Sequence, residues 1–224
     1  MNTIADSHGA NPTVDADIAP RRAFGLSFEP EYGHEHDRAR ITLSGFWLFM
    51  MSDLIIFGLM FATYVSMLKP MSFAGGPTPK DLFELRGAAL ETAALLTSTF
   101  TFGLASLAIK YDRGRAQVTF WLMVTLALGL VFLGLEVSEF VRMFAAGAVP
   151  QRSGFLSGFF GLVPLHGLHV TAGSIWLVMM LFQIRKAGLT DDVKSRLARL
   201  ALFWHFLDLI WVGIFSVVYL GGIG

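Results

Sequence analysis

Residues 154–184 read GFLSGFFGLVPLHGLHVTAGSIWLVMMLFQI, and this stretch decides the class of the protein. Its 31 residues contain no Lys, Arg, Asp or Glu. A helix needs roughly 20 predominantly apolar residues to cross the hydrocarbon core of a bilayer. The stretch is therefore long enough to be a transmembrane helix.

Four more stretches of the chain lack Lys and Arg over 23 to 28 residues. Of all 224 residues 54% are hydrophobic and only 15% are charged, whereas soluble domains are nearer a quarter charged. The sequence predicts an all-α, polytopic membrane protein in which one domain, residues 41–224, follows a disordered cytoplasmic tail, residues 1–40. The five predicted transmembrane helices are 41–68, 87–109, 116–141, 154–184 and 200–223.

The basic residues predict how this domain is oriented in the membrane. The N-terminal tail and the second and fourth loops carry 12 Lys and Arg, whereas the other loops and the C-terminus carry 5. Basic loops stay in the cytoplasm, so the N-terminus is predicted inside and the C-terminus outside. The fourth loop, 185–199, is basic enough to predict a short interfacial helix. Since the chain has no basic run, nucleic acid is not an expected partner.

Ionisable side chains inside the predicted helices are the candidate functional residues, because they are costly in a membrane and usually face protein or water. Counted along the helices, they form a set at inner to middle depth and a set of three glutamates near the outer ends. Several lie three residues apart, on one helix face. The inner set is Asp53, His166, His169, His205 and Asp208; the outer set is Glu91, Glu136 and Glu139.

Three interpretations are open for these residues: a metal or haem site, a proton relay, or polar contacts that hold helices together. We favour polar contacts, since neither glutamate pair carries the Glu-x-x-His motif of a di-iron bundle. The absence of Cys excludes thiolate ligands. No catalytic, cofactor-binding or metal-binding residue is therefore assigned. We expect no metal at His166, His169, His205 or Asp208, and expect each histidine to have a hydrogen-bond partner.

Five short strings narrow the family. Together, and in this order, they resemble subunit III of the haem-copper terminal oxidases, most closely the cytochrome o ubiquinol oxidase branch. The resemblance covers residues from about 41 to 224, because the motifs occur along this whole range in the order that the family has them. The strings are GFWLFMMSD (45–53), GGPTPKDLFEL (75–85), RSGFLS (152–157), HGLHV (166–170) and WHFLD (204–208).

The resemblance implies a non-catalytic subunit without haem or copper of its own. The resemblance further implies that this subunit belongs to a proton-pumping quinol:oxygen oxidoreductase in the bacterial inner membrane, whose catalytic subunit holds haem and copper. It implies subunits I, II and IV as partners, bound phospholipid, and support of proton uptake. Asp53 stands where the family has a buried carboxylate, often a Glu. The chain matches the five-helix form of the family.

Two alternatives remain open at this point: subunit III of a cytochrome c oxidase, and a stand-alone proton-coupled transporter. Two structural expectations also follow. The 18-residue link 69–86 and the family suggest that the first two helices separate from the last three and leave a lipid-holding cleft. Asp208 is expected to be either protonated or bonded to a donor on a neighbouring helix, and His205 is expected to share that partner or to bind a lipid headgroup.

Overall fold

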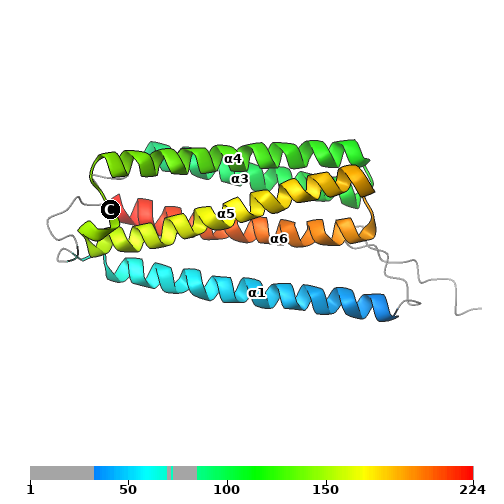
Figure 1. Ribbon diagram of the computed structural model, residues 1–224, viewed down its shortest axis with the longest axis horizontal. Helices are drawn as coiled ribbons and strands as arrows, with labels where there is room; N and C mark the ends of the chain where they lie inside the picture. Colours follow the sequence, from blue (N-terminus) through cyan, green and yellow to red (C-terminus); the bar gives the residue numbers. More distant parts are fainter. Residues whose placement is uncertain (1–32, 70–71, 73–84, 224) are drawn as a thin grey trace, which may run out of the picture.

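The computed structural model describes residues 33–69, 72 and 85–223. Within these ranges all regular structure is helical, and five helices are long and apolar enough to cross a membrane (Figure 1), which confirms the predicted fold class. The five helices are α1 (Gly33–Ser66), α3 (Leu85–Lys110), α4 (Arg115–Ala145), α5 (Gly154–Ala187) and α6 (Asp191–Ile214).

The segments that join and end these helices are short. A single 3₁₀ turn, η2 (Pro150–Arg152), precedes α5. A π-helical segment, η3 (Phe215–Leu220), and a last turn, α7 (Gly221–Ile223), extend α6. Gly188 ends α5 with φ 76°, a conformation that glycine adopts without strain. The helix α5 runs to Ala187, and α6 runs without a break from Asp191 to Ile214. The prediction of a short interfacial helix within 185–199 is therefore wrong.

Four of the long helices, α3 to α6, pack into one bundle, and α1 lies against α5 and α6 (Figure 1). The helix α3 packs against α4 and α6, so the expected division between the first two and the last three membrane helices is wrong. Two features hold α3 in the bundle. The connection to α4 spans only residues 111–114, and hydrogen bonds join α3 to both neighbours.

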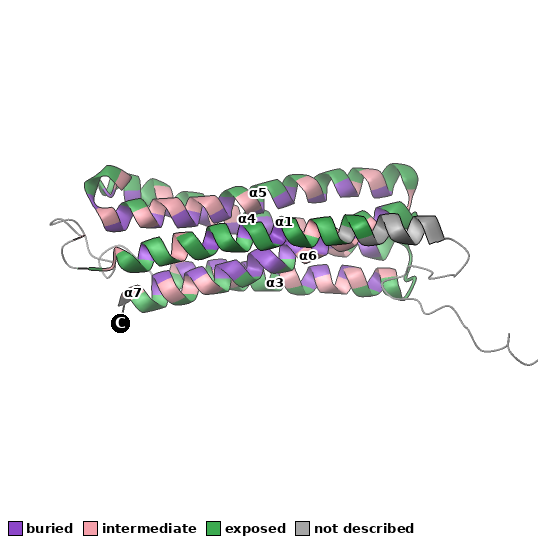
Figure 2. Cartoon of the chain, turned by 90° about the horizontal axis from the view of Figure 1, so that it is seen from below, coloured by how far each residue is buried: buried purple, intermediate pink, exposed green. Residues whose placement is uncertain are grey.

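The outermost helix, α1, touches the bundle along one narrow line. Its buried residues recur at helical spacing, as a single apolar stripe does, and Figure 2 shows the rest of this helix mostly exposed. Exposed apolar side chains on a membrane helix face lipid or another subunit. The buried residues of α1 are Met50, Asp53, Phe57 and Tyr64.

Two predictions about the chain ends are only partly covered by the structure. The helix α1 begins at Gly33, so residues 33–40, which the sequence placed in the tail, belong to a helix. Residues 1–32 and most of the link 69–86 lie outside the described residues. The start of α1 and the end of α6 lie at opposite ends of the bundle (Figure 1). Which end faces the cytoplasm remains a prediction of the Lys and Arg count.

Candidate functional site

An ionisable pair joins α1 to α5 near the middle of the bundle. The Oδ2 atom of Asp53 lies 3.5 Å from Nε2 of His169. The ring of Phe57, one turn along α1 from Asp53, packs on His169 with the ring centroids 5.2 Å apart. The structure thus brings together Asp53 and His169, two of the candidates that the sequence placed at similar depth.

The geometry of His169 fixes which of its ring nitrogens carries a hydrogen. Its Nδ1 lies 2.8 Å from the carbonyl oxygen of Leu165. A carbonyl only accepts, so Nδ1 carries a hydrogen. Nε2 and the carboxylate oxygen can therefore form a hydrogen bond only if one further proton lies between them. At 3.5 Å the two groups are within ion-pair distance, but Oδ2 of Asp53 has no partner in strict hydrogen-bond geometry within the described residues.

His166 lies on the same helix as His169 but in a different environment. Its side chain is fully buried, and neither ring nitrogen has a hydrogen-bond partner among the described residues. Three aromatic rings surround it: Phe57, Phe132 and Trp211, with centroids 6.3, 5.9 and 5.2 Å away. The expectation that each histidine is hydrogen-bonded is therefore wrong for His166, which packs as an aromatic side chain.

The pair expected on α6 does not form a unit. His205 is exposed, with its ring 6.3 Å from that of Phe102. Asp208 is buried and faces the hydroxyl of Thr99 on α3, although neither Oδ1 of Asp208 nor Oγ1 of Thr99 has a partner in strict hydrogen-bond geometry within the described chain. A donor on a neighbouring helix thus faces Asp208, and His205 does not share it.

The three outer glutamates come together in the interior of the bundle. Glu91 of α3 lies within electrostatic range of Glu136 and Glu139 of α4, and all three are buried. The hydroxyl of Tyr219 donates a hydrogen bond to Oε2 of Glu139 over 3.1 Å. Both carboxylate oxygens of Glu136 lie so close to Gly167 of α5 that a Cβ there would be 2.7 Å away. A side chain at residue 167 would therefore displace the carboxylate of Glu136 from its observed position.

Several interhelical contacts were not predicted from the sequence. Nε1 of Trp204 donates to Oγ of Ser98 over 2.8 Å, and Nε1 of Trp211 donates to Oγ1 of Thr92 over 3.1 Å. The hydroxyls of Thr101 and Thr125 lie 2.8 Å apart. The available signal was that buried Trp and Thr inside membrane helices need polar partners. These neutral contacts bind α3 to α4 and α6.

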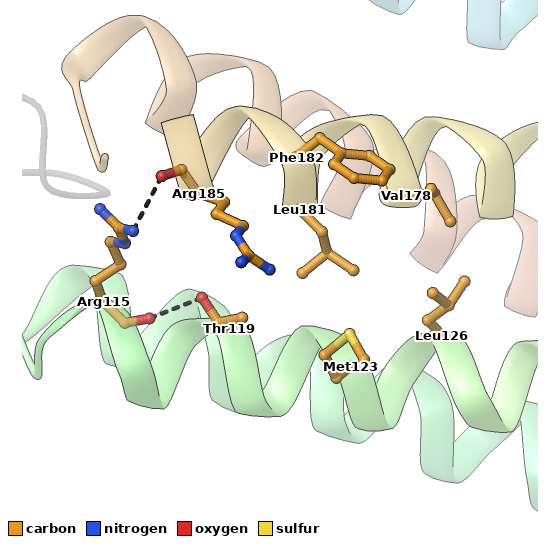
Figure 3. Close-up of a pocket in the computed structure, with 8 residues that line it drawn as sticks. All are labelled: Arg115, Thr119, Met123, Leu126, Val178, Leu181, Phe182 and Arg185. Atoms are coloured by element: carbon orange, nitrogen blue, oxygen red, sulfur yellow. Dashed lines mark hydrogen bonds between the residues drawn. The ribbon is translucent and has the colours of Figure 1, made fainter. Parts of the chain in front are cut away.

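The structure also contains a groove between α4 and α5. Its volume is about 330 Å³, and Figure 3 shows two arginines at one end and apolar side chains along the rest. A guanidinium nitrogen of Arg115 donates to the backbone oxygen of Arg185 over 3.0 Å. The other residues that line the groove are Thr119, Met123, Leu126, Val178, Leu181 and Phe182.

Within the described ranges, no three His, Cys, Asp or Glu side chains are placed so that they could hold a metal ion. The absence of a metal at His166, His169, His205 and Asp208 stays a prediction, which metal analysis can test. Some of the candidate residues, such as Asp53, His169 and Glu139, make polar contacts between helices, whereas His166 and His205 make none with a described residue.

Comparison with known proteins places the chain in a family. Residues 27–223 match the family described as cytochrome c oxidase subunit III. The chain belongs to this family. Similar relatives indicate which branch of the family the chain resembles.

One relative is the cytochrome bo(3) ubiquinol oxidase subunit 3 of Pseudomonas putida, 50% identical over 188 residues that cover 84% of this chain and 89% of the relative. The counterpart in Pseudomonas aeruginosa is 46% identical over 86% of this chain and 92% of its own length. The quinol oxidase subunit 3 of Bacillus subtilis is 40% identical over 85% of this chain and 92% of its own length. The resemblance to the quinol branch of subunit III is thereby confirmed.

Proposed function

We propose that the chain is the non-catalytic subunit III of a proton-pumping quinol oxidase in the inner membrane of a bacterium. The observation that carries the proposal is the high identity, over nearly the whole chain, to quinol oxidase subunits from Pseudomonas and Bacillus. In such a complex the catalytic subunit, with its haem and copper, oxidises quinol and reduces oxygen. This chain packs beside it, together with subunits II and IV.

The role of the chain in the complex is structural. Several polar side chains inside its helices contact other helices, as in the pairs Asp53–His169 and Trp204–Ser98. Such contacts support helix association. The wide exposed apolar faces, on α1 above all, provide surface for phospholipid and for partner subunits.

The chain further supports proton uptake by the catalytic subunit. The support for this is the Asp53–His169 pair, which places a carboxylate and an imidazole 3.5 Å apart across two helices. An intramembrane pair of this kind is a typical element of proton relays. Its contribution is to sustained activity rather than to the chemical step, since the reaction takes place in another subunit.

The experiment that tests the proposal is affinity purification through a tag on this chain from detergent-solubilised native membranes. We expect mass spectrometry to identify oxidase subunits I, II and IV in the eluate. We also expect a haem spectrum, and oxygen consumption with ubiquinol but not with reduced cytochrome c. Oxygen consumption with cytochrome c alone would make the chain a subunit of a cytochrome c oxidase. A haem-free eluate whose chain transports a solute against a proton gradient in liposomes would make it a stand-alone transporter.

A further inference from the structure

We infer that the groove between α4 and α5 binds one anionic phospholipid, with its phosphate at Arg115 and Arg185. This inference deepens the lipid-binding part of the proposed function and rests on it. It concerns a site within the bundle, whereas the cleft expected from the sequence would have lain between the first two and the last three membrane helices.

The end of the groove provides a binding site for a phosphate. Arg115 is the first residue of α4, and Arg185 lies in the last turn of α5. The guanidinium of Arg115 is held across the opening by its bond to the backbone oxygen of Arg185. The guanidinium of Arg185 points from α5 into the gap (Figure 3) and makes no hydrogen bond or ion pair within the described residues. Guanidinium groups bind phosphate oxygens in pairs of parallel hydrogen bonds.

The body of the groove fits an acyl chain. Below the two arginines the lining is Thr119 followed by apolar side chains of both helices. From Arg115 to Leu126 the groove extends 11 residues along α4, or about 16 Å. That length is close to half of the roughly 30 Å hydrocarbon core, which is the depth of one leaflet. A lipid whose phosphate lies at the arginines would therefore have its chain in the apolar part.

The charge of the groove selects the class of lipid. Both charged side chains that line it are cationic, so a headgroup with a net negative charge, such as phosphatidylglycerol, is favoured over a zwitterionic one. The Lys and Arg count places this end of the bundle in the cytoplasmic leaflet, where juxtamembrane basic residues attract anionic lipid. The volume of about 330 Å³ admits the phosphate and the upper part of one chain, while the second chain lies on the outer surface of the two helices.

The test compares phosphatidylglycerol bound to the intact complex by native mass spectrometry after exchange into vesicles of phosphatidylcholine and phosphatidylglycerol. The double variant Arg115→Gln/Arg185→Gln removes both cations from the groove. The matched control, Arg113→Gln/Lys186→Gln, removes the same charge from exposed neighbours outside it. A third variant, Val178→Trp, fills the groove and keeps both arginines. Assembly of each complex is checked by size-exclusion chromatography.

We expect the double variant and Val178→Trp each to lose one phosphatidylglycerol per complex, and the control to bind as many as the wild type. Equal binding in all four proteins would overturn this site but leave lipid binding elsewhere intact. A wild-type complex that binds no phospholipid would overturn both this site and the lipid-binding part of the proposed function. If the double variant instead loses another subunit with its lipid count unchanged, a protein segment fills the groove and the inference is wrong.

Discussion

The carboxylate of Asp53 on α1 lies 3.5 Å from Nε2 of His169 on α5, at the narrow line where the outermost helix meets the bundle. Because Nδ1 of His169 lies 2.8 Å from the carbonyl oxygen of Leu165, Nε2 is the ring nitrogen that faces the carboxylate. The pair therefore helps to attach α1 to the bundle through α5.

Two replacements of Asp53 distinguish the contribution of its charge from that of its shape and hydrogen bonding. In Asp53→Asn the amide can donate to a neutral Nε2, so we expect the complex to stay assembled. Asp53→Leu leaves Nε2 without its partner, and we expect the thermal stability of the complex to fall by about 1 kcal/mol, the usual size of an interhelical hydrogen bond in membranes. The measurement is the melting temperature of the purified complex. Ser52→Ala, at an exposed neighbour, is the control, and an equal loss for it would contradict this role.

Gly167 and Glu136 provide a test of close packing in the glutamate cluster. A methyl group at residue 167 would lie 2.7 Å from both carboxylate oxygens, so Gly167→Ala should destabilise the complex by about 1–3 kcal/mol, as overpacking does. Gly134→Ala is the matched control on α4, since a methyl there meets nothing within 4 Å. The double variant Gly167→Ala/Glu136→Ala should recover part of the loss. A melting temperature unchanged by Gly167→Ala would argue against the observed position of Glu136.

His166→Phe tests whether the buried histidine is a packing residue or a ligand. Its ring lies among Phe57, Phe132 and Trp211 with no hydrogen bond to a described residue. An unsatisfied buried polar group is costly. We therefore expect Phe to preserve assembly, to raise stability by about 1 kcal/mol, and to leave the iron and copper content per complex unchanged. Elemental analysis of the purified complex is the measurement. Loss of metal from an assembled variant would make His166 a ligand.

Ser98→Ala tests how α3 is held to α6. The hydroxyl of Ser98 accepts the only polar hydrogen of the buried Trp204 side chain over 2.8 Å, so its loss should lower the thermal stability of the complex by about 1 kcal/mol. Thr97→Ala is the control, because the hydroxyl of Thr97 is exposed and bonds only within its own helix, to Ala93. In Trp204→Phe the effect of Ser98→Ala should be smaller, because only the long bond of Ser98 to the backbone oxygen of Thr125, 3.5 Å, is then lost. An equal effect in both backgrounds would rule out this contact as the cause.

The sequence predicted the five helices because each apolar run is bounded by Lys or Arg on at least one side, and helix length in a membrane is set by the thickness of the bilayer. Depth along each helix also followed from counting residues, and it placed Asp53 level with His169. The rotation of each helix about its axis could not be predicted by counting residues. Residues three apart differ by about 60° around the helix, and that difference is enough to direct His169 to Asp53 and His166 to Phe132 and Trp211.

Which helices pack against each other in the bundle could also not be predicted from a single sequence. The long link 69–86 suggested that α1 and α3 separate together from the other three membrane helices. A link, however, constrains only the distance between two helix ends. The position of α3 is instead determined by side chains such as Thr101, which meets Thr125 on α4. Ser and Thr are common in membrane helices, where most bond to their own backbone, as Thr97 does. Which hydroxyls cross to a neighbour becomes visible only in three dimensions.

Asp208 permits the sharpest separation of a packing role from a catalytic one. The residue is buried on α6 and faces the hydroxyl of Thr99 on α3. Asp208→Asn keeps the shape and can still accept a hydrogen bond, so we expect normal assembly and normal initial oxidase turnover. Asp208→Leu removes the acceptor and leaves Thr99 facing an apolar group. That change should loosen this subunit and shorten the active lifetime before it lowers the initial rate.

The measurements are the initial rate of quinol oxidation, its decay over repeated turnovers, and the amount of this chain that stays with the complex during purification. Thr99→Val removes the other half of the contact and should resemble Asp208→Leu. Leu209→Asn, at an exposed neighbour, controls for a change of polarity on α6. If Asp208→Asn abolished initial turnover while the complex stayed assembled, hydrogen bonding and shape would be insufficient. The ionisable carboxyl itself would then be required, and Asp208 would have a direct part in proton transfer.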